Sequence, residues 1–202
     1  KMRNLGEACT AANRIYVHEN IADEFTKRLS ERMFALKVGD GTDPGVDVGP
    51  LVNAATRDKV AEFVNDAVAK GARIECGGTA HDGTGYFYPP TVLSNVPETA
   101  ACVHDEIFGP VAAVQTFVDQ GDVIKRANDT EYGLVAYVFS EDFKRALQVC
   151  ERLEYGMVGL NRGLVSDPAA PFGGVKQSGL GREGGHEGML EFMETRYISA
   201  NW

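Results

Sequence analysis

The strongest constraint on the fold is the regular alternation of apolar, strand-like segments with amphipathic helices. Strand-like segments occur at residues 14–18, 111–118, 134–139 and 157–160, and the last two are almost continuously apolar. Such runs are typical of strands buried on both faces, as in parallel sheets that helices cover. The alternation therefore predicts an α/β fold: a three-layer, mostly parallel sheet with helices on both faces.

The longer helices are predicted from apolar residues that recur three or four positions apart. They are expected over residues 21–36, 56–70 and 141–153. The second ends before Gly71, which suits a left-handed C-terminal cap, and Ser140 is expected to cap the third. The side chains expected to face the core are Ile21, Phe25, Leu29 and Met33, then Val60, Phe63, Val64 and Ala67, and finally Phe143, Ala146, Leu147 and Cys150.

Shorter signals fill the rest of the chain. Residues 73–76 alternate as a strand, residues 77–85 form a polar turn, and residues 86–93 are extended because two adjacent prolines exclude helix. With 202 residues and 44% hydrophobic content, the chain can bury a sizeable core. No internal repeat interrupts it, so we expect one domain.

Charge and cysteine content exclude several classes of function. The net charge of −9 argues against nucleic acid and an anionic membrane as partners, and no apolar run is long enough to span a bilayer. The four cysteines form neither a disulfide pattern nor a metal-binding spacing, which suits a reducing cytoplasm. Packing roles are expected for Cys76 and Cys150, and a surface or packing role for Cys102.

Cys9 is the candidate nucleophile. It follows a small loop over residues 5–8 and precedes small residues at 10–12, which are expected to form a helical turn. A thiol in the first turn of a helix is favoured as the nucleophilic thiolate, and the nearby backbone N–H groups can hold an oxyanion. The alternative is that Cys9 is a small buried apolar residue, as many cysteines are.

Three motifs in order give the chain a family resemblance. Residues 6–11, flanked by Asn4 and Arg14, resemble the active-site cysteine signature of the aldehyde dehydrogenase superfamily. The stretches 106–110 and 171–183 match the same superfamily in the same order. The resemblance implies that Cys9 adds to an aldehyde, which is then oxidised through a thioester.

The resemblance also implies the domain organisation. Residues 1–194 would be the catalytic, cysteine-bearing domain, and residues 195–202 an oligomerisation tail whose strand joins an intersubunit sheet. The N-terminal dinucleotide-binding domain, with the general-base Glu and an oxyanion-stabilising Asn, would lie upstream of residue 1. We therefore expect a fragment that is inactive alone, taken from a cytoplasmic homo-oligomer, a dimer or a tetramer.

The resemblance assigns cofactor contacts to Glu106 and Phe108. Glu106 would accept hydroxyls of the nicotinamide ribose, and the Phe108 ring would pack beside the nicotinamide of NADP or NAD. The alternative is a solvated Glu106 and a core Phe108. In the glycine-rich stretch 171–183, we expect close backbone packing rather than a phosphate-binding loop. The resemblance supports this view and implies that Phe172 lines the aldehyde tunnel.

Two residues indicate the aldehyde. The stretch 159–174 resembles the succinate-semialdehyde dehydrogenase subfamily, in which an Arg six positions before the cysteine and a Ser in this stretch bind the distal carboxylate. Those positions are Arg3 and Ser166 here. Arg162 is a second basic candidate. Some members of that subfamily carry a second cysteine two residues after the nucleophile and use the pair as a redox switch. That position is Ala11 here, so a switch of this kind is not available. Alternative substrates are glutarate semialdehyde and an uncharged aldehyde, and an alternative function is that of a non-catalytic domain that kept the fold. For the cofactor, the resemblance favours NADP over NAD.

Overall fold

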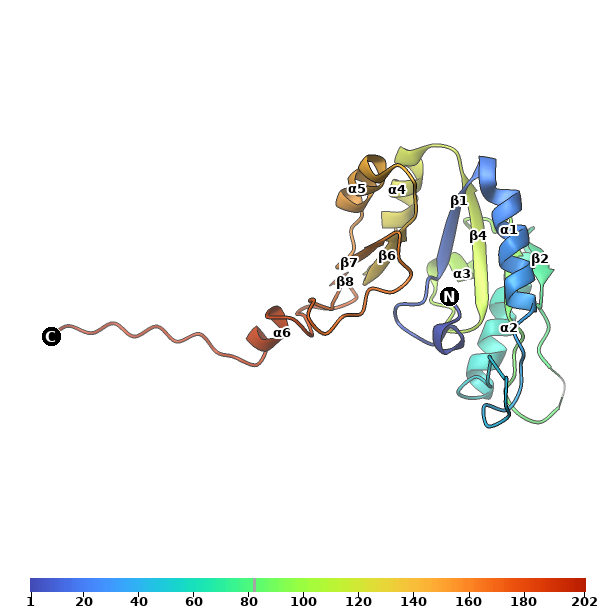
Figure 1. The fold of residues 1–202 in the computed structure, drawn as a ribbon, viewed down its shortest axis with the longest axis horizontal. Helices are drawn as coiled ribbons and strands as arrows, with labels where there is room; N and C mark the ends of the chain where they lie inside the picture. Colours follow the sequence, from blue (N-terminus) through green and yellow to red (C-terminus); the bar gives the residue numbers. More distant parts are fainter. Residues whose placement is uncertain (82) are drawn as a thin grey trace. The chain divides into compact units, whose positions relative to one another are not determined.

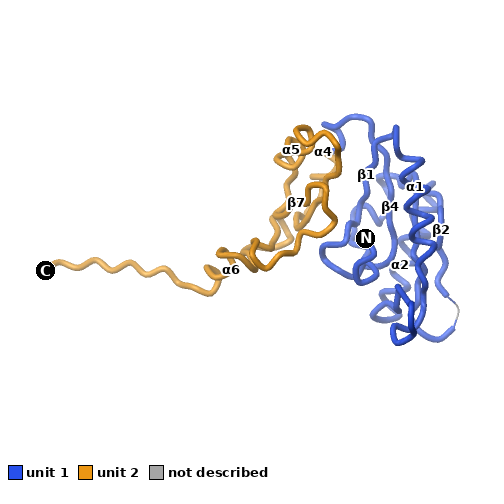
Figure 2. The backbone as a smooth tube through the Cα atoms, viewed as in Figure 1, with its two compact units in different colours: residues 1–123 blue, residues 124–202 orange. Residues whose placement is uncertain are grey.

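A computed structural model describes residues 1–81 and 83–202 of the chain. It divides into two compact units, residues 1–123 and residues 124–202 (Figure 2). The polar turn predicted over residues 77–85 contains residue 82, which lies outside the described residues.

The first unit is built on a four-stranded sheet with the order β1-β4-β3-β2. The β1–β4 and β3–β4 pairs are parallel, and β2–β3 is antiparallel. In chain order the elements are the 3-10 helix η1 (Arg3–Gly6), β1 (Arg14–His18), α1 (Glu19–Phe34), α2 (Ala54–Ala69), β2 (Arg73–Cys76), β3 (Thr91–Ser94), α3 (Ala101–His104), β4 (Val111–Phe117) and α4 (Gln120–Asn128), which contains the boundary between the units.

Helices cover both faces of this sheet (Figure 1). Along β4, Ala112 and Val114 pack in the core cluster that contains residues of α1. The alternate residues Val111 and Ala113 pack in the other cluster, with residues of α2 and α3. Because successive side chains of a strand point to opposite faces, this division gives three layers. The predicted α/β fold with a mostly parallel sheet and helices on both faces is confirmed.

The predicted core face is confirmed for α2 and is partly wrong for α1. All four inward residues predicted for α2 are buried, and Gly71 has the left-handed φ of 110° expected of its cap. In α1, Met33 is buried, but Ile21 is 58% exposed and Phe25 is exposed too. The smaller Ala22 and Thr26 are buried instead, and Ala22 packs in the core cluster with residues of β1, β3 and β4.

In β2 the alternation breaks between Ile74 and Cys76, where the pairing with β3 shifts its register. Cys76 packs against the core cluster beside α1, as expected, while Ile74 is exposed. A bulge of this kind moves a side chain to the other face of a sheet.

The second unit holds two small sheets. The pair β5–β8 is antiparallel and the pair β6–β7 is parallel. Its elements are β5 (Tyr132–Gly133), β6 (Val135–Val138), α5 (Phe143–Arg152), β7 (Met157–Leu160), β8 (Val175–Lys176) and α6 (Glu187–Leu190).

Two predictions for α5 are wrong. Its N-terminal cap is Asp142, whose carboxylate accepts from the Arg145 N–H at 3.0 Å, rather than Ser140. Of the predicted core face, Ala146 is buried, whereas Phe143 is 62% exposed and Leu147 is also exposed. The reason is that α5 packs on a sheet of only two strands, which offers little area to cover a helix face.

After α6, the residues up to Trp202 form no regular element and all are exposed. The terminal intersubunit strand therefore stays a prediction. None of the helices in the described part of the chain is long and apolar enough to cross a membrane.

Candidate functional site

Cys9 lies in a tight turn rather than in a helix. The Ala11 N–H donates to the Ala8 carbonyl at 2.9 Å, and the chain then turns toward β1. The predicted helical turn after Cys9 is wrong, because three small residues give too few hydrogen bonds to nucleate a helix. The nearby helical element, η1, precedes Cys9, and its Asn4 and Leu5 have left-handed φ values of 46° and 42°.

Exposure separates Cys9 from the other three cysteines. The side chain of Cys9 is exposed, and its thiol is free. Burial raises the pKa of the Cys102 thiol to about 11. Burial also raises the pKa of the thiols of Cys76 and Cys150, so these three remain protonated at neutral pH. The alternative that Cys9 is a buried apolar residue does not fit this geometry.

The 106–110 motif presents two side chains around a buried anchor. Ile107 is fully buried in the core beside α2 and fixes the segment. Glu106 is exposed on one side of it, and Phe108 is 37% exposed on the other, with a left-handed φ of 47°. Phe108 is therefore not a core residue. A bulky residue in this conformation is strained and persists only where its surroundings hold it.

The Cys9 segment and the 106–110 segment meet through two glycines. A Cβ on Gly6, whose φ is 84°, would overlap the carbonyl oxygen of Gly109. A Cβ on Gly109 would in turn lie 2.5 Å from Val60 Cγ2 in α2. Only glycine allows this approach, and it brings together the first two sequence motifs, with Cys9 three residues beyond Gly6.

Asn13 joins the same two segments on the other side of Cys9. Its Nδ2 donates to the carbonyls of Cys102 and Asp105, both at 3.0 Å, and its Oδ1 accepts from the Ile107 N–H at 2.8 Å. Sequence reasoning missed this residue, because nothing in the local sequence indicates which distant backbone groups an asparagine will meet.

Lys1 is a second residue that sequence reasoning missed. Burial lowers the pKa of its ammonium group to about 8, and the negative charge of Glu106 opposes part of this shift. The charge of the Lys1 ammonium group therefore interacts with that of the carboxylate that the second motif presents. No local pattern distinguishes it from a surface lysine.

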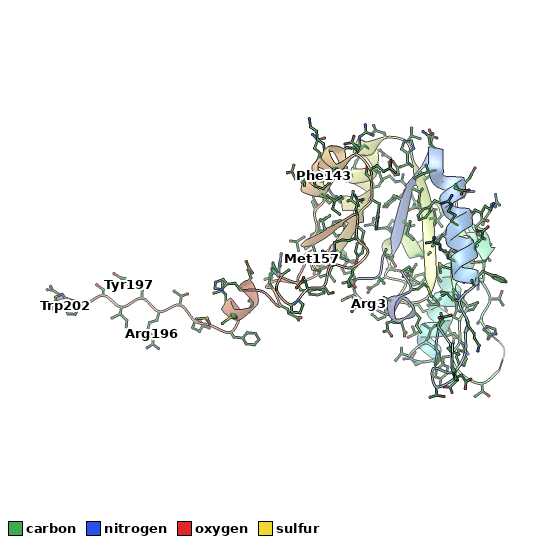
Figure 3. The ribbon with its side chains drawn as sticks, viewed as in Figure 1. Arg3, Phe143, Met157, Arg196, Tyr197 and Trp202 are labelled. Carbon is green, nitrogen blue, oxygen red and sulfur yellow. The ribbon has the colours of Figure 1, made fainter. Side chains whose placement is uncertain are left out.

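Arg3 lies in η1, six residues before Cys9, and its side chain is exposed (Figure 3). Its guanidinium makes no ion pair within residues 1–81 and 83–202. The Arg3 guanidinium is therefore available to an anionic ligand.

Ser166 and Phe172 belong to the second unit, whereas Arg3, Cys9 and the 106–110 motif belong to the first. Ser166 is exposed in an irregular segment. Phe172 is half-buried and exchanges two backbone hydrogen bonds with Glu183, both at 2.7 Å.

The glycine-rich stretch packs closely on itself, as expected. A Cβ on Gly173 would lie 2.6 Å from the carbonyl oxygen of Gly181. The Arg182 guanidinium donates to the carbonyl of Gly174 at 2.8 Å, so it is engaged in holding the loop together.

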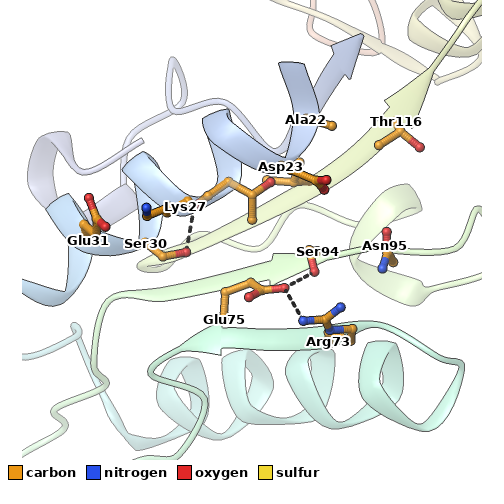
Figure 4. A pocket seen from close by; sticks show the side chains of 12 residues that line it. Ala22, Asp23, Lys27, Ser30, Glu31, Arg73, Glu75, Ser94, Asn95 and Thr116 are labelled. Carbon is orange, nitrogen blue, oxygen red and sulfur yellow. Dashed lines mark hydrogen bonds and ion pairs between the residues drawn. The ribbon is translucent and has the colours of Figure 1, made fainter. Parts of the chain in front are cut away.

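A cavity of about 350 Å³ lies elsewhere in the first unit, between α1 and the sheet (Figure 4). It includes none of the predicted site residues. Two of its charged groups pair with each other: Glu75 lies 3.6 Å from the Arg73 guanidinium, and it also accepts a hydrogen bond from Ser94 Oγ. Within the described residues, no cluster of three His, Cys, Asp or Glu side chains is suited to hold a metal ion.

Comparison with known proteins identifies the family to which this geometry belongs. Residues 1–198 match the aldehyde dehydrogenase family. The chain is 58% identical to the succinate-semialdehyde dehydrogenase of Paenarthrobacter nicotinovorans over 198 residues, which are 98% of this chain and 44% of that protein. It is 47% identical to the NADP(+) succinate-semialdehyde dehydrogenase GabD of Escherichia coli K12, over 98% of this chain and 41% of that protein.

A solved structure agrees with these relatives. The crystal structure of succinate-semialdehyde dehydrogenase from Burkholderia pseudomallei matches with a TM-score of 0.93 and 47% identity, covering 95% of this chain and 40% of that one. The chain thus spans about two fifths of the length of these relatives. It belongs to the aldehyde dehydrogenase family.

Proposed function

We propose that the full-length protein oxidises succinate semialdehyde to succinate with NADP or NAD, and that this chain supplies its nucleophile. The observation that carries the proposal is the exposed thiol of Cys9, held beside the Glu106–Phe108 segment by the Gly6–Gly109 contact. The names of the relatives support the substrate and, for one of them, NADP.

The chemistry begins with addition of the Cys9 thiolate to the aldehyde carbon, which forms a C–S bond and turns the carbonyl oxygen into an oxyanion. The nicotinamide cofactor, when bound, accepts the hydride that leaves this carbon. The product on Cys9 is a thioester, which water hydrolyses to release the acid and restore the thiol. The base that activates this water, and an asparagine that stabilises the oxyanion, would come from the part of the protein upstream of residue 1.

The residues present suit a nicotinamide nucleotide. The exposed carboxylate of Glu106 can accept hydrogen bonds from both hydroxyls of a ribose, and the exposed face of the Phe108 ring can pack beside the nicotinamide. Ile107, buried between them, keeps the two side chains at a fixed spacing. They hold and orient the cofactor, and neither takes part in proton transfer.

Recognition of the substrate would rest on Arg3 and Ser166. A guanidinium presents two parallel N–H donors to a carboxylate, and a hydroxyl adds a third hydrogen bond. The guanidinium of Arg3, which is exposed and makes no ion pair with the described residues, supports this role. Phe172 would line the path of the aldehyde. Bringing these residues of the second unit to the Cys9 thiol is part of the proposal.

A comparison of two aldehydes tests the substrate. Butanal has the chain length of succinate semialdehyde but lacks the anion. The wild-type enzyme should prefer succinate semialdehyde in kcat/KM by roughly 30- to 1,000-fold, equivalent to about 2–4 kcal/mol for a charge-assisted hydrogen bond. Arg3→Ala should remove most of this preference and leave butanal oxidation nearly unchanged, because Arg3 does no chemistry.

Arg162→Ala is the matched control, since Arg162 is the other exposed arginine considered for the carboxylate. It should keep the preference. Equal losses on both aldehydes in Arg3→Ala would make Arg3 a support of the Cys9 segment. A wild-type enzyme that favours glutarate semialdehyde, or shows no preference for an anion, would overturn the succinate assignment.

A further inference from the structure

We propose that Asn13 is a positioning residue, which fixes the separation between the Cys9 thiol and the side chains of Glu106 and Phe108. The inference rests on the proposed function and adds to it a residue that sets the geometry of hydride transfer. Asn13 contacts neither substrate nor cofactor in this role. It acts through the backbone of residues 102–107.

The hydrogen bonds of Asn13 use the whole amide group. Two carbonyl oxygens, of Cys102 and Asp105, need donors, and one backbone N–H, of Ile107, needs an acceptor. Only one orientation of the amide meets all three. The two carbonyls lie at the C-terminal end of α3, where helix carbonyls lack partners within the helix.

The position of Asn13 in the chain lets these hydrogen bonds fix the Cys9 turn relative to the 106–110 segment. Asn13 lies four residues after Cys9 and directly before β1, which is anchored by parallel pairing with β4. Its third bond reaches Ile107, the residue between Glu106 and Phe108. On the N-terminal side of Cys9, the Gly6–Gly109 contact fixes the chain against the 106–110 segment. The exposed turn that carries Cys9 is therefore held at both ends against the segment that faces the cofactor.

Asn13 and its three hydrogen bonds act as a brace, and the strained backbone at Phe108 explains why this brace matters. A φ of 47° is costly for a phenylalanine and is retained only when neighbouring contacts over-determine it. The Ile107 N–H is adjacent to this residue and is held by Asn13. Loss of the brace would let the segment relax, and a displacement of about 1 Å between reacting groups can cost about 100-fold in rate.

The test uses the full-length enzyme with Asn13→Ala and Asn13→Asp. Asn13→Asp keeps the shape and the acceptor for Ile107 but cannot donate to the two carbonyls. Both variants should raise the KM for the nicotinamide cofactor and lower the rate of single-turnover NADPH or NADH formation, together by about 10- to 100-fold in kcat/KM. The rate of Cys9 alkylation by iodoacetamide, which needs no cofactor, should change by less than about threefold.

Asn128→Ala is the matched control. The Asn128 amide also bridges distant backbone groups, the Arg152 carbonyl at 2.9 Å and the Glu154 N–H at 3.0 Å, but in the second unit. It should lower the melting temperature without changing the cofactor KM per folded molecule. Equal effects of Asn13→Ala and Asn128→Ala on kcat/KM would show that Asn13 only stabilises the fold and would overturn the proposal.

Two further readouts keep the outcomes apart. If Asn13→Ala does not fold, the cofactor KM and the single-turnover rate of the isosteric Asn13→Asp variant test the proposal instead. If the wild-type enzyme oxidises no aldehyde, the proposed function fails, and the role of Asn13 is decided by NADPH binding in a fluorescence titration. An unchanged dissociation constant for NADPH in a folded Asn13→Asp enzyme would then reject it.

Discussion

At the scale of single residues, exposure distinguishes Cys9 from chemically identical side chains. Alkylation of a thiol requires the thiolate and access of the reagent. Burial denies access to Cys102 and raises the pKa of its thiol to about 11. It also raises the pKa of Cys76 and Cys150, so at neutral pH all three stay in the unreactive protonated form.

We therefore expect iodoacetamide to label Cys9 of the folded full-length enzyme first, as read by peptide mapping over time. Cys102 should be labelled only after unfolding, which makes it the internal control. Raising the pH should speed the labelling of Cys76 and Cys150, because a raised pKa delays formation of the thiolate to higher pH, while burial keeps Cys102 out of reach of the reagent. Faster labelling of any of these three at neutral pH would remove Cys9 as the nucleophile.

Cys9, Glu106 and Phe108, which the sequence indicated as candidate site residues, each belong to a contiguous motif. Cys9, Glu106 and Phe108 could be assigned because their neighbours in the chain carry the signature. Asn13 and Lys1 could not. The role of Asn13 depends on backbone groups about ninety positions away, and that of Lys1 on burial beside Glu106. Local sequence carries neither kind of information.

At the scale of elements, α2 supports the candidate site through one close contact. Gly109→Ala would press a new methyl group onto Val60 Cγ2, 2.5 Å away, and should cost about 1–3 kcal/mol as overpacking. Val60→Ala should cost about 2 kcal/mol through the cavity it leaves. The double variant should lose clearly less than the sum, because the cavity accepts the added methyl group.

Urea unfolding of the full-length protein, with hydrogen exchange of α2 amides, measures this coupling. Val64→Ala is the control, since Val64 is equally buried in α2 but is not the neighbour of Gly109. Its cost should add to that of Gly109→Ala. Additive costs for the Val60 pair would mean that α2 does not set the position of the 106–110 segment.

The helices also show how far periodicity determines packing. The pattern identified α2 correctly because its apolar residues are the ones that the sheet covers. In α1 the pattern found the helix but not its face, since Ala22 and Thr26 allow closer packing than Ile21 and Phe25. In α5 the strongly apolar face exists, but the sheet beneath it is too narrow to cover it. Spacing predicts which side chains share a face, and the partner decides whether that face is buried.

At the scale of the whole molecule, the chain would carry only part of the proposed active site. It spans about two fifths of the length of its relatives, and its candidate residues divide between two compact units. The proposed nucleophile, Cys9, and the proposed cofactor-facing pair, Glu106 and Phe108, lie in the first unit, and Ser166 and Phe172 lie in the second. The base for thioester hydrolysis is expected from neither. In the proposed enzyme, oxidation therefore depends on residues from both units and from the rest of the full-length protein.

The C-terminal tail, residues 195–202, is the segment through which we expect subunits of the full-length protein to associate. Tyr197 and Ile198 expose most of their side chains, and residues 195–202 form no hydrogen-bonded element within the chain (Figure 3). An extended segment with unpaired backbone groups readily joins the edge of another sheet. We expect residues 196–199 to pair in this way with a second subunit of the full-length protein.

Deletion of residues 195–202 should therefore convert the full-length oligomer to monomers in sedimentation velocity, because it removes both the apolar side chains and the backbone that would pair. Deletion of residues 200–202 alone is the control: it removes the exposed Trp202 but leaves 196–199, and it should keep the oligomer. Ile198→Pro should act like the longer deletion, since proline cannot donate to a strand ladder. An oligomer that survives both the long deletion and the proline substitution would place the subunit contact outside the tail.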